Sequence, residues 1–89
     1  MKTSYKVMHY WYNADASSRS DADTYDIVVV FDNEASAKNY AEELQHKLEE
    51  DRRNGTTGWA DYKGTDRYYY EELKVYESID EFTTLNLGE

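Results

Sequence analysis

The stretch with the most unusual side-chain chemistry is RYYYEELKVYES, residues 67–78, in which three consecutive tyrosines precede two glutamates. Tyrosine rings can stack on nucleic-acid bases. A carboxylate can act as a general acid or base, and tyrosine is enriched at protein–protein interfaces. The stretch is therefore a candidate for a base-stacking platform, a catalytic cluster or a protein-binding face, or it is a strand with tyrosine on both sides.

Base stacking is the least favourable of these three uses. The chain carries 19 acidic against 10 basic residues, which gives a formal net charge of −9. Nucleic-acid affinity depends on Lys and Arg patches that contact phosphates, and anionic membrane surfaces require the same charges. We therefore expect no direct binding to nucleic acid or membrane, although simple solubility is a sufficient reason for an acidic protein.

Carboxylates, histidines and serines, which can support catalysis, are present, but their spacing in the sequence matches no known catalytic arrangement. Glu71 and Glu72 are neighbours in an expected strand, so their carboxylates point to opposite faces and form a poor acid–base pair. His9 and His46 lie in different expected elements, and neither has a carboxylate at a metal-ligand spacing. The serines lack a G-x-S-x-G motif, the glycines fit no phosphate-binding loop, and cysteine is absent. The sequence predicts neither an enzyme nor a metal or cofactor site.

The segment Asn13–Asp23 is small, polar and acidic. Its aspartates suggest calcium, but the glycine of a calcium-binding loop is missing and Arg19 occupies a position where a ligand is needed. We expect a mobile acidic loop in which Asp21 and Asp23 are available to a partner.

The remaining pattern alternates strands with one long helix. Strands are expected at Ser4–Tyr12, Thr24–Asp32 and Tyr68–Tyr76, with a further short strand possible at Trp59–Lys63. Asp32 or Asn33 can cap a helix that ends before Gly55, and its apolar stripe comprises Ala37, Tyr40, Ala41, Leu44 and Leu48. Residues 78–81 have the capping-box form S-x-x-E, which predicts a short helical turn towards Leu85.

This order predicts an α+β fold, a two-layer ββαβ domain with one amphipathic helix packed on a small, mainly antiparallel sheet. Residues 1–89 are expected to form a single domain with a thin core. The N-terminus lacks the apolar region of a signal peptide, and the longest apolar run, Ile27–Phe31, is too short to span a membrane. The expected location is cytoplasmic.

Strand alternation then assigns each side chain to a face of the sheet. The more aliphatic side of the last strand, with Tyr69, Leu73 and Val75, is expected to lie under the helix. The same reasoning places on the helix side Tyr5, Val7, Trp11, Ile27, Val29 and Phe31. The opposite side is expected to hold Lys6, Met8, Tyr10, Tyr12, Val28, Val30, Tyr68, Tyr70, Glu72, Lys74 and Tyr76.

One helix cannot cover both sides of a sheet, so the tyrosine-rich side needs an explanation. It is a solvated surface, a homodimer interface or a surface for a foreign protein. Excess acidic residues occur in two segments, 13–26 and 71–89, which flank these tyrosines in the sequence. Such charges would accelerate and orient association with a basic partner.

Three stretches, YKVMHYWY, VVVFDNEASAKNYAEELQHKL and YYYEELKVYESIDEF, resemble small uncharacterised ββαβ proteins of bacteria and their phages. The resemblance spans most of the chain and implies the fold, and it contains no catalytic motif. In size, acidity and tyrosine content the chain is also similar to phage anti-CRISPR and anti-restriction proteins, some of which imitate DNA. That likeness is one of composition and implies no site residues.

The leading hypothesis is a non-catalytic module that binds a protein, in the form of an inhibitor that mimics nucleic acid and blocks a nucleic-acid-handling protein. The residues expected to contact this partner are Tyr10, Tyr12, Asp21, Asp23, Tyr68, Tyr70, Glu72 and Tyr76. The alternative is a structural domain that forms a homodimer through the same tyrosine-rich face.

Overall fold

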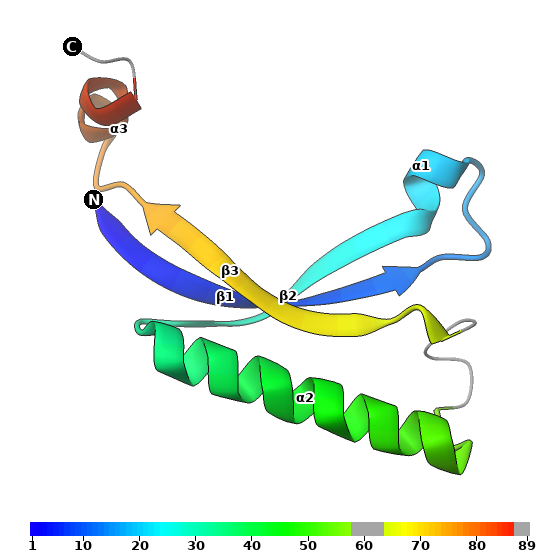
Figure 1. The fold of residues 1–89 in the computed structure, drawn as a ribbon. Coiled ribbons are helices and arrows are strands. Elements are labelled where there is room, and N and C mark those ends of the chain that lie inside the picture. The colour runs from blue at the N-terminus through cyan, green and yellow to red at the C-terminus, as the bar shows by residue number, and fades with distance from the viewer. Residues whose placement is uncertain (58–63, 87–89) are drawn as a thin grey trace.

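A computed structural model describes residues 1–57 and 64–86 of the chain. Its elements are β1 (Lys2–Tyr12), α1 (Arg19–Ala22), β2 (Asp23–Phe31), α2 (Glu34–Asn54), β3 (Arg67–Val75) and α3 (Ile79–Asn86). The expected α+β fold, with the order ββαβ followed by a short helix, is confirmed (Figure 1). The segment expected to be an irregular loop contains the short helix α1. The possible strand Trp59–Lys63 lies outside the described residues.

The described strands form one antiparallel sheet in the order β2-β1-β3. The central strand β1 pairs with β3 in an unbroken register, whereas its pairing with β2 shifts between Val7 and Met8. Val7 lies opposite Val29 and Met8 lies opposite Ile27, so Val28 is an extra residue in β2. This is a β-bulge, which bends the strand and changes its alternation.

Helix α2 begins and ends where its capping residues predict. The Asn33 side chain accepts a hydrogen bond from the Ser36 amide at 2.8 Å. Gly55 follows the last turn with φ of 70°, a left-handed conformation that costs glycine little. Its amide donates to the Arg52 carbonyl at 3.3 Å. These local bonds satisfy backbone groups that the helix ends leave without partners.

The core lies between α2 and one side of the sheet. Val7, Ala37 and Ala41 are buried at its centre. Around them pack larger, partly buried side chains, namely Tyr5, Val29, Phe31, Tyr40, Leu44 and Tyr70. Because α2 presents alanines to the sheet, long aromatic side chains from the strands have room to fill the layer between them.

The predicted faces of β3 are wrong. Tyr70 packs against the core and lies opposite Val7, and antiparallel partners project to the same side of a sheet. By alternation Tyr68, Tyr70 and Glu72 lie on the helix side. Tyr69, Leu73 and Val75 therefore project to the opposite side. The prediction assumed that aliphatic residues fill the core better than tyrosine does. The small alanine side chains of α2 instead leave room for the longer tyrosine side chain between helix and sheet.

The bulge corrects a second assignment. Ile27 was expected on the helix side with Val29 and Phe31. The extra residue Val28 reverses the alternation, so Ile27 lies opposite Met8 on the other side of the sheet. The predicted helix-side positions of Tyr5, Val7, Val29 and Phe31 are confirmed.

A polar contact joins β1 to the segment that precedes β3. Asp66 is only 5 % exposed, and its Oδ2 lies 2.8 Å from His9 Nε2. The His9 ring stacks on Tyr68, with ring centres 4.5 Å apart, and Arg52 donates to the Asp66 carbonyl oxygen at 3.1 Å. The segment is thus held to both the sheet and the end of α2.

The molecule is elongated, with principal extents of 53 × 34 × 15 Å. Helix α2 lies along one side of the sheet, while α1 and α3 lie at opposite ends and rise on the other side (Figure 1). In the described part of the chain, no helix combines the length and the apolar character needed to cross a membrane.

Candidate protein-binding surface

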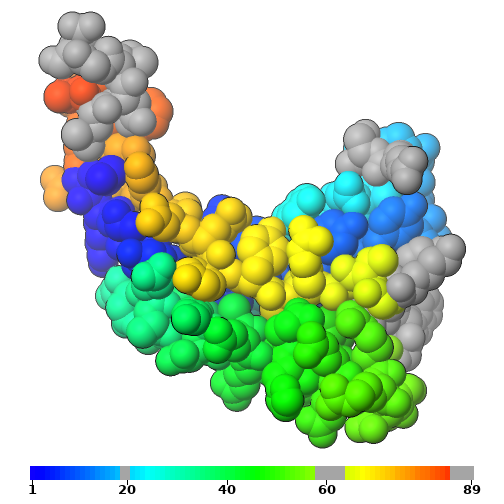
Figure 2. Space-filling model, viewed as in Figure 1, coloured from blue at the N-terminus to red at the C-terminus, as the bar shows by residue number. Residues whose placement is uncertain are grey.

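The side of the sheet away from α2 is called here the outer face. Its residues follow from the strand registers and are Lys6, Met8, Tyr10 and Tyr12 of β1, Asp23, Tyr25, Ile27 and Val30 of β2, and Arg67, Tyr69, Glu71, Leu73 and Val75 of β3. Figure 2 shows the molecule in profile as a curved body, with α2 on its convex side and a hollow between its two raised ends. The outer face forms the floor of this hollow.

Large apolar side chains on the outer face are exposed to solvent. Tyr25 and Ile27 are 52 % and 54 % exposed, and Val30 and Val75 are 44 % and 46 % exposed. Single exposed apolar residues are ordinary on protein surfaces, whereas a set that shares one face is typical of an interaction site.

The middle of this face is closely packed although α2 lies on the other side. Met8 is only 5 % exposed and lies opposite Ile27 on one side and Tyr69 on the other. Its neighbours on the sheet therefore cover it. A docking partner would contact packed apolar side chains here, so little conformational entropy would be lost in ordering them.

A cation held between two aromatic rings occupies one end of the outer face. The Arg67 guanidinium carbon lies 4.7 Å from the centre of the Tyr10 ring and 5.6 Å from that of Tyr69. Tyr10 also packs against Tyr25, with ring centres 5.2 Å apart, and donates a hydrogen bond from its hydroxyl to Asp23 Oδ1 at 2.6 Å. These contacts fix the orientations of the arginine and tyrosine before any partner binds.

The hydrogen bond from Tyr10 to Asp23 has a measurable signature. Together with burial and the negative charge of Asp23, it raises the pKa of Tyr10 to about 12. We expect Asp23→Asn to lower this pKa towards the ordinary value of about 10. Because the folded-state pKa is raised, the stabilising contribution is complete below about pH 10 and is lost as the pH rises towards 12.

An NMR titration with tyrosine labelled at the ring carbon that bears the hydroxyl measures the pKa of Tyr10 directly. Asp21→Asn is the matched control, because it removes the same charge from the same end of the molecule without touching the hydrogen bond. An unchanged Tyr10 pKa in Asp23→Asn would contradict the bond.

The structure brings only part of the predicted partner-binding set together. Tyr10 and Tyr12 lie on the outer face, and Asp23 is at its edge through the bond to Tyr10. Asp21 lies in α1, where its side chain accepts a hydrogen bond from Ser18 Oγ at 2.8 Å. Tyr76 follows β3 and packs edge-on against Phe82 of α3, with ring centres 5.0 Å apart.

Three members of the predicted set, Tyr68, Tyr70 and Glu72, lie on the helix side and are not part of the outer face. Sequence reasoning in turn missed Tyr25, Ile27, Arg67 and Tyr69. Arg67 precedes Tyr69 by two residues, which places the two side chains on one side of a strand. That spacing is the pattern that could have identified the pair.

The acidic residues gather near the two ends of the hollow. One group belongs to the β1–β2 connection and the start of β2, namely Asp15, Asp21 and Asp23, whereas Asp26 projects to the helix side and accepts a hydrogen bond from Trp11. The other precedes or begins α3, namely Glu77, Asp80 and Glu81, of which Glu81 pairs with the amino group of Met1. On the floor between them Lys6 pairs with Glu71, with Nζ and Oε1 3.6 Å apart, and Arg67 adds a positive charge. The ends are therefore more negative than the floor.

Residues 1–57 and 64–86 contain no group of three or more His, Asp or Glu side chains that could hold a metal ion. No protein-family model matches the chain, and comparisons with curated proteins and with solved structures likewise give no match.

Proposed function

We propose that this protein is a non-catalytic binding module that docks its outer face on a partner protein. The observation that carries the proposal is the Arg67 guanidinium held between the rings of Tyr10 and Tyr69. Tyrosine and arginine dominate the energetically important positions of protein interfaces, and side chains that are already oriented lose less entropy on binding. The exposed apolar residues around them supply the surrounding contact area.

The charge distribution supports a partner with basic residues on either side of an apolar contact. Such a partner would place its cations against the acidic groups near α1 and α3 while its centre meets the outer face. A protein that handles nucleic acid has basic surfaces of this kind. We propose that the module blocks such a surface in place of the nucleic acid, as an inhibitor of the kind found among phage proteins.

Two variants and two salt concentrations test this proposal by affinity capture from a host lysate with mass spectrometry. We expect the wild-type protein to recover a basic protein at low salt and less of it at high salt, because salt screens the steering charges. Tyr25→Ser combined with Ile27→Ser should lose this partner, since both side chains are more than half exposed on the outer face. Asn39→Ser, exposed on α2, should retain it.

Equal recovery by the double variant and the control would contradict docking through the outer face. If the double variant loses the partner but salt does not change its recovery, docking through the outer face would be supported. The proposal that the module mimics nucleic acid would then be contradicted. Competition between the module and nucleic acid for the purified partner then tests the blocking role.

Self-association is the second candidate, because the exposed apolar set on the outer face would also be buried by another copy. Two copies each carry a formal charge of −9, which opposes their approach. Light scattering over a wide concentration range distinguishes the two functions. A monomeric mass throughout supports the foreign partner, and a dimer that Tyr25→Ser with Ile27→Ser dissociates supports the homodimer.

A further inference from the structure

A second surface lies along the free edge of β3, next to the outer face. In the part of the chain that the structure describes, β3 pairs with β1 and has no strand on its other side. An edge strand presents backbone donors and acceptors that can pair with another chain. Helix α2, which covers the Val7 side of the sheet, also borders this edge.

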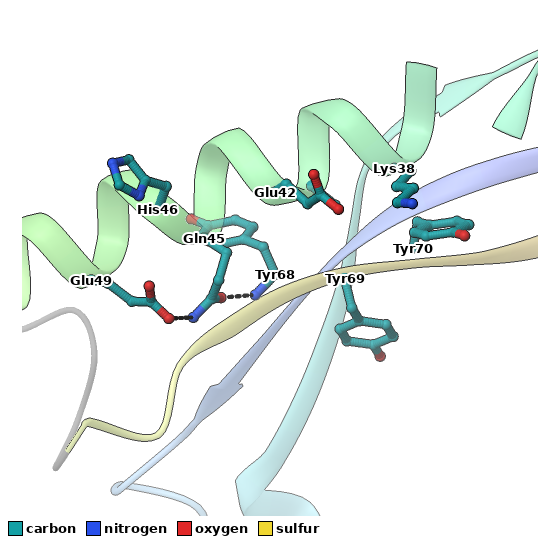
Figure 3. Close-up of a pocket in the computed structure, with 9 residues that line it drawn as sticks. Lys38, Glu42, Gln45, His46, Glu49, Tyr68, Tyr69 and Tyr70 are labelled. Atoms are coloured by element: carbon teal, nitrogen blue, oxygen red, sulfur yellow. Dashed lines mark hydrogen bonds between the residues drawn. The ribbon is translucent and has the colours of Figure 1, made fainter. Parts of the chain in front are cut away.

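One side chain shows which backbone groups point out of this edge. Gln45 Oε1 accepts a hydrogen bond from the Tyr68 amide at 2.8 Å, so the N–H of Tyr68 points away from β1 (Figure 3). In an antiparallel strand the outward direction recurs at every second residue. The backbone groups of Tyr70, Glu72 and Lys74 therefore also point outward. The side-chain carbonyl of Gln45 thus occupies the position that a backbone carbonyl of an added strand would take beside Tyr68.

A groove runs between this edge and α2, with a volume of about 440 Å³. Figure 3 shows that Tyr68 and Tyr70 point towards α2 while Tyr69 points away from it. The α2 wall of the groove comprises Lys38, Ala41, Glu42, Gln45, His46 and Glu49. An extended chain beside β3 would thus pair with the outward backbone groups of the strand and contact α2 with its side chains.

The groove is negatively charged. Among the described residues that line it, Glu42 and Glu49 are acidic and Lys38 is basic. Glu34 accepts a hydrogen bond from the Tyr70 hydroxyl at 3.2 Å, and Glu72 projects to the same side of β3, as does the cation Lys74 farther along the strand. The opposite side of the edge is more apolar, because there the neighbours of an added strand would be Tyr69, Leu73 and Val75, together with Glu71, which pairs with Lys6. Alternate residues of an added strand thus meet acidic and apolar surroundings.

We propose that β3 accepts an extended peptide segment with alternating basic and apolar residues as a fourth strand of the sheet. Its backbone pairs with the outward groups of Tyr70, Glu72 and Lys74. Its basic side chains lie on the helix side beside Glu42 and Glu72, and its apolar side chains lie beside Tyr69 and Leu73. Strand addition of this kind obtains affinity from backbone bonds and specificity from alternate side chains.

A second copy of this chain is a poorer occupant of the same edge. Antiparallel pairing of two β3 strands would bring two sets of the groove carboxylates together, and like charges across a sheet are destabilising. A basic segment instead neutralises them. The proposal rests on the backbone edge of β3 and the groove beside α2, so it goes beyond the proposed function although Tyr69 and Leu73 also belong to the outer face. Variants on the far strand β2 distinguish failure of one proposal from failure of the other.

The probe is a short synthetic peptide of alternating lysine and valine with blocked ends, titrated into the full-length protein by calorimetry at low salt. A second peptide of the same sequence carries methyl groups on its backbone nitrogens, which removes the donors that strand addition needs. We expect the first peptide to bind, with NMR shifts at Tyr70 and Glu72, and the methylated peptide not to bind.

Matched variants separate specific contacts from general attraction to an acidic protein. Glu42→Gln with Glu49→Gln should weaken binding about tenfold, because the variant removes two neighbouring charges from the groove. Glu43→Gln with Glu50→Gln removes the same net charge from α2 at positions that do not line the groove, and should change affinity less than about twofold. Tyr25→Ser, on the far strand β2, should bind the peptide normally.

Equal binding of the methylated peptide, or equal weakening by both glutamate pairs, would overturn strand addition at β3. Absence of binding by the unmodified peptide would overturn it as well. A dimeric protein whose interface proves to be β3 would assign the edge to a second copy and reject the basic segment.

Discussion

Val7→Asp is expected to unfold the protein at room temperature. Val7 has no exposed surface and belongs to the buried core cluster with Ala37 and Ala41. An ionised carboxylate without a partner in such a site costs several kcal/mol. A small domain has a total stability of only about 5 kcal/mol, so this one substitution is enough to exhaust it. Far-ultraviolet circular dichroism and urea unfolding measure the effect.

Val30→Asp is the matched control for this substitution. It introduces the same charge into the same sheet, but the side chain is 44 % exposed and lies on the outer face. We expect the control to remain folded, with a stability change within about 1 kcal/mol. If both variants unfolded equally, the assignment of α2 to the Val7 side of the sheet would be contradicted.

Tyr70→Ser is expected to lower the free energy of unfolding by about 1–3 kcal/mol. Its ring packs against the core, and its hydroxyl donates to Glu34 of α2. The substitution therefore removes both apolar contact and a hydrogen bond between β3 and the helix. Urea unfolding provides the measurement, because the midpoint shifts while the slope stays constant if only stability changes.

Tyr25→Ser is the corresponding change on the outer face, where the tyrosine is 52 % exposed. Its effect on stability should be smaller than that of Tyr70→Ser, and its effect on capture of a partner larger. The opposite order would return Tyr70 to the binding surface, where the sequence first placed it.

The sequence predicted the order of the elements and the ends of α2 correctly because these depend on local chemistry. Asn33 and Gly55 act within a few residues of their own positions. Ser78 likewise accepts a hydrogen bond from the Glu81 amide at 3.2 Å, as the capping-box pattern indicates. Such bonds need no knowledge of the rest of the chain.

The faces of β3 could not be predicted in the same way, because tyrosine occurs on both of them. Which set of tyrosines faces α2 depends on how far the helix stands from the sheet, and that depends on Ala37 and Ala41. The relevant information therefore lies in another element. The alternation of residues within β3 alone does not contain it.

The candidate site was predicted in part for a related reason. Tyr10 and Tyr12 were placed on the correct face, since β1 alternates regularly through the core. Ile27 was placed on the wrong face because one extra residue reversed the alternation of β2. Arg67 was overlooked because its role in the site depends on contacts with the rings of Tyr10 and Tyr69. The pairing of β1 with β3 brings the Tyr10 ring close to it.

The bulge at Val28 has a consequence for the protein at high concentration. β2 is an edge strand, and it carries the apolar run from Ile27 to Phe31. A flat edge of this composition is a template on which further molecules can stack into cross-β fibrils. The bulge interrupts the regular ladder in the middle of that run. Deleting Val28 would leave Ile27 and Val29 on their present faces and straighten the edge. The extra valine therefore breaks the edge that a second molecule would otherwise extend by strand pairing.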